Sequence, residues 1–141
     1  LGARFHHLNM KNSGPKLIVA CLPGEHHEFG LLLFALMALG KGYQIILLGA
    51  DLPIGDLPHV AAKAGCDGIV LSGSASLACE ALYQDILDLN EAVSLPVFIG
   101  GDVANTCRDD LDRTGIYVLG HDLMASLYVI SGRINNTDQQ A

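Results

Sequence analysis

Short apolar runs alternate with longer helix-compatible stretches along most of this chain. The runs are rich in Val, Ile and Leu and are bounded by glycine, proline or serine, which predicts buried strands. They lie at 16–22, 43–48, 68–72, 96–99 and 116–119. The intervening stretches predict helices at about 28–41, 55–65, 77–91, 103–113 and 122–132. Because this alternation favours right-handed crossovers, we expect an α/β fold, a flavodoxin-like or Rossmann-like five-stranded parallel sheet with helices on both faces.

Length and composition predict one domain with irregular ends. The chain has 141 residues and half of them are apolar, which is enough for a single core. We expect a linker or arm at 1–14, the folded domain at 15–133 and a disordered tail at 134–141. The longest apolar stretch, Gly30–Gly40, is too short to span a bilayer, and no signal peptide is evident, so we expect a cytoplasmic protein with no membrane partner. The chain opens with Leu1 rather than Met, as a piece of a longer protein would.

The net charge and the cysteine pattern argue against several kinds of binding site. A net charge of −7 argues against direct nucleic-acid binding, because the phosphate backbone is held mainly by clustered Lys and Arg. Cys21, Cys66, Cys79 and Cys107 show no C-x-x-C spacing and mostly fall in apolar surroundings. This pattern predicts buried thiols in a reducing cytosol rather than disulfides or a zinc site.

The loop after the first predicted strand carries the strongest chemical signal. Glu25, His27 and Gly30 form a Glu-x-His-x-x-Gly pattern at a strand-to-helix junction, where open α/β sheets bind their ligands. An imidazole nitrogen binds metals, a carboxylate orients it, and glycine allows close approach to the backbone. The alternative is that His27 is a solvated loop histidine. We expect the adjacent His26 to face solvent or the edge of a ligand.

Small residues recur after the other predicted strands, on what would be one rim of the sheet. Together with the first loop they form a candidate binding site. Its members are Glu25, His26, His27, Gly30, Leu31, Asp51, Leu52, Pro53, Ser72, Gly73, Ser74, Gly100, Gly101, Asp102, Gly120 and His121. The simpler alternative is that glycine and serine only make tight turns here, with Ser76 and Asp102 as helix N-caps.

Other α/β sites do not fit the same rim. A phosphoacceptor receiver domain needs an Asp at the end of the third predicted strand, where Leu71 and Ser72 stand. The chain contains no G-x-G-x-x-G after its first predicted strand, no P-loop motif and no G-x-S-x-G nucleophile elbow. We therefore expect a bound cofactor and no catalytic residue.

The order of these motifs resembles the cobalamin-binding domains of methionine synthase and methylmalonyl-CoA mutase. The resemblance rests on Glu25-x-His27-x-x-Gly30, then Ser72-Gly73-Ser74, then Gly100-Gly101, and spans roughly 15–133. It implies cobalamin as the cofactor, in its adenosyl, methyl or hydroxo form, with His27 as the lower axial ligand of cobalt. It also implies that the nucleotide tail lies in a slot between sheet and helices. The matching slot residues are Gly30, Ser72, Ser74, Gly100 and Gly101.

The chain departs from the enzyme pattern at two positions, and the segment around the first of them favours a sensor. Glu25 replaces the usual Asp and Ser74 the usual Leu, and the Pro-Gly-Glu before the histidines looks more like MerR-type cobalamin-dependent regulators, including light-responsive repressors. The resemblance implies a sensor module of a transcriptional regulator, a homo-oligomer at full length. Its partner would be an upstream helical bundle or DNA-binding domain outside this chain. The alternatives are a carrier domain of a cobalamin-dependent methyltransferase or mutase, or a fold whose cofactor has been lost or replaced, for example by haem.

Overall fold

A six-stranded sheet forms the centre of the protein, which we describe from a computed structural model covering residues 5–8, 13–22, 29–48, 53–73 and 79–140. The strand order is β1-β3-β2-β4-β5-β6. The strands are β1 (Phe5–Leu8), β2 (Lys16–Cys21), β3 (Gln44–Leu48), β4 (Gly68–Ser72), β5 (Val97–Gly100) and β6 (Tyr117–Val118). β1 pairs antiparallel with β3, and the other five strands are parallel. The predicted five-stranded parallel sheet is confirmed, with one antiparallel strand added at its edge.

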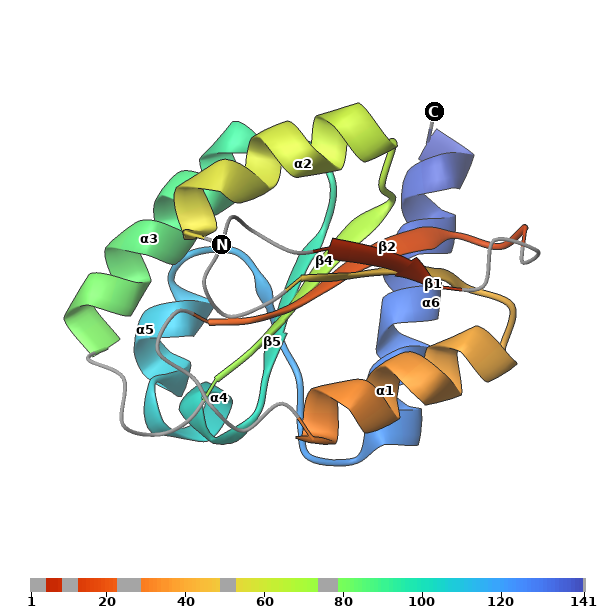
Figure 1. The fold of residues 1–141 in the computed structure, drawn as a ribbon. Coiled ribbons are helices and arrows are strands. Elements are labelled where there is room, and N and C mark those ends of the chain that lie inside the picture. Colours follow the sequence, from red (N-terminus) through yellow and green to blue (C-terminus); the bar gives the residue numbers. More distant parts are fainter. Residues whose placement is uncertain (1–4, 9–12, 23–28, 49–52, 74–78, 141) are drawn as a thin grey trace.

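Helices cover both faces of the sheet (Figure 1). They are α1 (Phe29–Gly40), the 3-10 turn η1 (Ile54–Asp56), α2 (Leu57–Ala64), α3 (Cys79–Ala92), α4 (Asp102–Thr106), α5 (Arg108–Asp112) and α6 (Leu123–Gln140). α1 and α6 lie on one face, and α2 to α5 lie on the other. In the described parts of the chain, no helix combines the length and apolar character needed to cross a membrane.

The two helical layers explain why the strands are apolar without alternation. Side chains of successive strand residues point to opposite faces. In β2, Ile18 packs in the core under α2 to α5, while Val19 packs in the core under α1 and α6, and both are fully buried. Phe98 of β5 is also fully buried on the α1 and α6 side. A strand buried on both faces must be apolar at every position, which is what the continuous runs in the sequence signal.

The strand order reverses direction at the central strand β2. β2 lies between β3 and β4, so the chain moves to one side of β2 first and then crosses to the other side. This reversal is the topological switch point at which open α/β sheets bind ligands. The carboxyl ends are tied together there, since Leu22 N–H donates to the Ser72 carbonyl at 2.8 Å.

The chain ends and one helix differ from the sequence predictions. The arm predicted at 1–14 contains β1, whose four residues pair with the outer edge of β3. The single helix predicted at 103–113 is two helices, since Cys107 (φ −108°, ψ 20°) leaves helical geometry between them. The tail predicted to be disordered continues α6 to Gln140, and buried Ile134 anchors this helix against the sheet.

The prediction for the cysteines is half wrong. Cys21 and Cys66 are buried thiols outside any disulfide, as expected, but Cys79 and Cys107 form a disulfide with their Cα atoms 5.4 Å apart. The two positions are 28 residues apart, so no short spacing motif marks them. The α3-β5-α4 crossover brings the start of α3 beside the end of α4, and only this tertiary arrangement pairs the sulfurs.

Candidate functional site

A slot of about 280 Å³ opens at the carboxyl ends of β4, β5 and β6, between α1 and α6. Apolar side chains and glycine backbone form most of its wall. The lining residues are Gly30, Leu31, Phe34, Val70, Leu71, Ser72, Gly100, Gly101, Leu119, Gly120, His121, Leu123 and Ser126. The structure therefore brings Gly30, Leu31, Ser72, Gly100, Gly101, Gly120 and His121, which the sequence placed in one site, around one cavity.

The two adjacent glycines of the slot have different roles. Gly101 has a φ of +85°, and a Cβ there would lie 2.6 Å from the Gly73 carbonyl oxygen. Both the backbone conformation and this close approach require glycine at 101. A Cβ at Gly100 would instead meet the Leu119 Cβ at 3.6 Å, an ordinary contact. The backbone therefore accepts a Cβ at 100, and this position lines the slot.

Backbone hydrogen bonds hold the end of β4 against the start of α4. Val103 N–H donates to the Gly73 carbonyl at 3.1 Å, and Gly73 N–H donates to the Gly100 carbonyl at 3.4 Å. Ser72, half-buried at the end of β4, would have its Oγ 2.9 Å from a Cβ at 101. These bonds fix the main chain directly behind Gly100 and Gly101, the two glycines of the slot wall.

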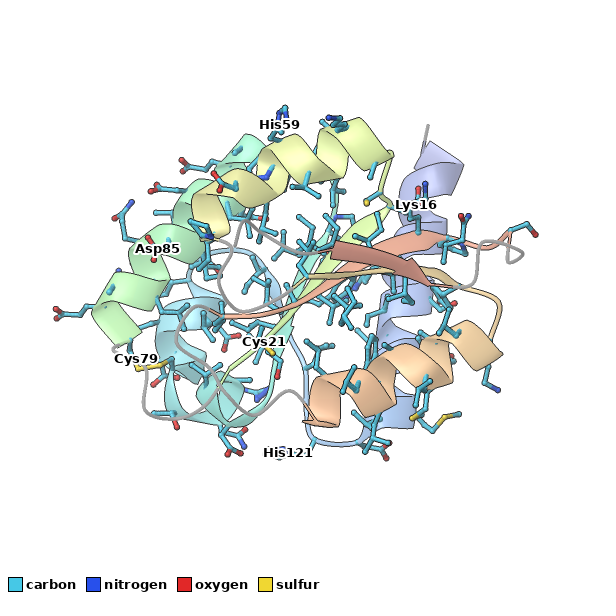
Figure 2. All side chains as sticks on the ribbon, in the orientation of Figure 1. Lys16, Cys21, His59, Cys79, Asp85 and His121 are labelled. Atoms are coloured by element: carbon cyan, nitrogen blue, oxygen red, sulfur yellow. A yellow bond between two sulfur atoms is a disulfide. The ribbon has the colours of Figure 1, made fainter. Side chains whose placement is uncertain are left out.

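His121, labelled in Figure 2, lines the slot in the loop after β6. Asn105 of α4 contacts its ring. The Asn105 Nδ2 to His121 Nε2 distance is 2.7 Å. The neighbouring Asp122 accepts the Ala125 N–H at 3.1 Å, capping the first turn of α6. Sequence analysis missed Asn105, because no motif marks it and only the tertiary fold places α4 beside the loop after β6.

Some predicted site residues lie away from the slot lining. Pro53 precedes η1. Asp102 is the first residue of α4, so the predicted N-cap position is taken by Gly101 instead, and no side chain caps this helix. Gly73 contacts Gly101 but does not line the cavity.

Other predicted site residues fall outside the part of the chain that the structure describes. They are Glu25, His26, His27, Asp51, Leu52 and Ser74. Among the residues that are described, no group of three or more His, Cys, Asp or Glu side chains is placed to hold a metal ion. In sequence, the Glu25 to His27 segment directly precedes α1, whose first turns contribute Gly30, Leu31 and Phe34 to the slot.

Comparison with known proteins identifies what this arrangement is similar to. A family model described as B12 binding domain matches residues 15–125. The HTH-type transcriptional repressors CarA and CarH of Myxococcus xanthus are both 33% identical, over 90 and 103 residues respectively. These matches cover 63% and 72% of this chain but only 31% and 34% of the repressors, so the chain spans about a third of their length. The methanol:cobalamin methyltransferase complex MtaBC of Methanosarcina barkeri shares the fold, with a TM-score of 0.72 at 15% identity over 86% of this chain and 46% of that chain.

Proposed function

Because this chain belongs to the B12 binding domain family, with cobalamin as its cofactor, we propose that it is the cobalamin-binding sensor module of a transcriptional regulator. The similarity to two HTH-type transcriptional repressors supports a regulatory role. The observation that carries the proposal is the slot at the carboxyl ends of β4, β5 and β6. Glycine at 100 leaves this cavity open, although the backbone would accept a side chain there.

The slot residues fit the nucleotide tail of cobalamin. Main chain at Gly100 and Gly101 and apolar walls such as Phe34 and Leu119 accept a flat heterocycle without leaving a charge buried. His27 is the proposed lower ligand of cobalt, and Glu25 the proposed acceptor for the other ring N–H, which would fix the imidazole tautomer. Cobalt suits imidazole ligation, and the cofactor, when bound, would supply a metal centre that exchanges ligands or, in a photoreceptor, responds to light.

The partners of the module follow from its charge and from the exposed side of the cofactor. At a net charge of −7, this part of the protein does not hold DNA itself, so DNA contact belongs to another segment of a cytoplasmic regulator. A bound corrin ring would leave apolar surface exposed, and a helical bundle or a second copy would cover it. Cofactor binding and assembly are then thermodynamically linked, each strengthening the other by the same factor.

Absorption spectra test cofactor binding directly. The chain is mixed with adenosylcobalamin or hydroxocobalamin in the dark and after illumination, and the spectrum of the protein-bound fraction is recorded. We expect the base-off spectrum of cobalamin ligated by a protein histidine. A spectrum identical to that of free cobalamin, or a haem spectrum in the protein as purified, would overturn the proposal.

A carrier domain of a corrinoid methyltransferase or mutase is the second candidate, supported by the shared fold of the MtaBC complex. Sedimentation of the full-length protein separates the two functions. A sensor changes its oligomeric state between the four conditions of adenosylcobalamin present or absent, dark or illuminated. An unchanged state in all four, together with methyl transfer or mutase turnover when substrate is added, would favour the carrier.

A further inference from the structure

We infer that Cys79 and Cys107 form a reversible redox site whose state sets the affinity of the slot through the short helix α4. The disulfide ties the first residue of α3 to the residue between α4 and α5, and it is visible at the start of α3 in Figure 2. The redox site itself requires only these two sulfurs. Its effect on cobalamin affinity rests on the proposed function.

The two sulfurs differ in access, which fixes the order of exchange. Cys79 is half-buried, whereas Cys107 is 2% exposed. A thiolate of a dithiol reductant attacks Cys79 Sγ, the S–S bond breaks, and Cys107 leaves with the electron pair and takes a proton. The second thiolate of the reductant then displaces Cys79, so the reductant leaves as a disulfide and both cysteines are thiols. A low-molecular-weight disulfide such as oxidised glutathione reverses both steps.

The other described thiols do not compete for this chemistry. Burial raises the pKa of the Cys66 thiol to about 11, so Cys66 is protonated and a poor nucleophile at neutral pH. Cys21 is 3% exposed in the core under α1 and α6, on the opposite side of the sheet from Cys66. Redox exchange is therefore confined to the Cys79 and Cys107 pair, and Cys66 provides a matched control.

Helix α4 lies between the disulfide and the slot. It begins directly after Gly101 in the slot wall, and its Val103 N–H donates to Gly73. Its Asn105 contacts His121 at the rim, with 2.7 Å between the two nitrogens. The residue that ends the helix, Cys107, is bonded to α3. The oxidised bond thus fixes one end of a helix that begins directly after the slot wall and contacts the rim through Asn105.

We expect reduction to leave α4 folded but less constrained. Val103 and Ala104 are buried, at 0% and 1% exposure, and Cys107 N–H donates to the Val103 carbonyl at 2.9 Å, so contacts other than the disulfide also hold this helix. The covalent link to α3 is lost, so the position of Asn105, and with it the His121 ring, is set by packing alone. We expect the oxidised slot to be better preorganised and to bind cobalamin more tightly than the reduced slot.

Thiol counting tests the redox site without cobalamin. The full chain is equilibrated with oxidised glutathione and denatured in the presence of iodoacetamide, which alkylates free thiols. Mass spectrometry then gives the number of alkylated cysteines. We expect two alkylated cysteines, Cys21 and Cys66, and four after prior treatment with dithiothreitol. Four alkylated cysteines after equilibration with oxidised glutathione, or two that persist in excess dithiothreitol under native conditions, would overturn the inference.

Cobalamin titration of variants tests the coupling without a reductant that could react with cobalt. Compared with the oxidised parent, Cys79→Ser should raise the cobalamin Kd about 3- to 10-fold, and Cys107→Ala should do the same. Asn105→Ala should weaken binding in the parent and add little in the Cys79→Ser background, because both act through α4. Cys66→Ala should leave the Kd unchanged.

The outcomes separate this coupling from the proposed function. Equal Kd values for the parent and a folded Cys79→Ser variant, with the fold checked by circular dichroism, would refute the coupling. No cobalamin binding by any variant, with thiol counting as expected, would refute the proposed function and the coupling that rests on it while the redox site stands.

Discussion

The substitution Gly100→Leu tests whether glycine at 100 is needed for cobalamin binding rather than for the fold. A Cβ at 100 makes only an ordinary 3.6 Å contact with Leu119, so the backbone accepts a side chain. The remaining leucine atoms enter the slot of about 280 Å³, which holds no protein atoms. We expect the free energy of unfolding to change by less than about 1 kcal/mol, since loss of glycine also lowers the entropy of the unfolded chain.

The cost of this substitution should fall on cobalamin. Overpacking a filled site costs about 1–3 kcal/mol, which corresponds to a Kd roughly 5- to 150-fold higher. Absorption titration measures this Kd, with cobinamide, which lacks the nucleotide tail, as the ligand control. Gly100→Ala should bind cobalamin nearly as the parent does, because its single methyl group stays within ordinary contact of Leu119.

Gly101→Ala provides the contrasting variant. Its φ of +85° and the 2.6 Å approach to the Gly73 oxygen predict a loss of about 1–3 kcal/mol in stability. Thermal unfolding would detect this as a lower Tm, whereas Gly100→Leu should keep the parental Tm. If Gly100→Leu bound cobalamin as tightly as the parent, or weakened cobinamide equally, the tail would not occupy this slot.

Three further changes test other parts of the structure. His27→Ala should abolish the histidine-ligated cobalamin spectrum while His26→Ala leaves it intact, and an unchanged spectrum in the His27 variant would contradict the assignment. Burial raises the pKa of the Cys66 thiol from 9.0 to about 11 in the folded protein. The contribution of this thiol to the free energy of unfolding is therefore complete below pH 9 and is lost as the pH rises through 11. Urea unfolding of parent and Cys66→Ala should show this as a difference of up to about 2 kcal/mol in pH dependence, and parallel curves would disprove it. Asp67→Ala removes the carboxylate that accepts the Lys16 N–H at 2.8 Å and should cost about 1–2 kcal/mol, against less than about 0.5 kcal/mol for exposed Asp85→Ala.

The sheet and much of the slot could be predicted from the sequence. The sheet could be predicted because strands buried on both faces must be continuously apolar. The slot could be predicted because the carboxyl ends of parallel strands meet at one edge, which assigns residues as distant as Gly30, Ser72 and Gly120 to one rim. No local signal revealed Phe34 as a slot wall, because a buried helical phenylalanine looks the same in the sequence whether it faces a core or a cavity.

Contacts that depend on packing between distant segments were not predicted. The pairing of Cys79 with Cys107 and the contact of Asn105 with His121 both require α4 to be placed first against α3 and against the loop after β6. Periodicity gives the existence of a helix but not its position relative to its neighbours. The same limit applies to β1, whose four residues carry too short a pattern to indicate a strand without its partner β3.

Strand β1 has a practical consequence for anyone trimming this protein. The family match begins at residue 15, yet the partner of the outer edge of β3 is Phe5–Leu8. A chain cut at residue 15 would leave the outer backbone groups of Ile45–Leu48, a run of Ile and Leu, open to pairing with another molecule. Such an edge is a template for aggregation, so we expect the shortened chain to aggregate more readily than the full chain.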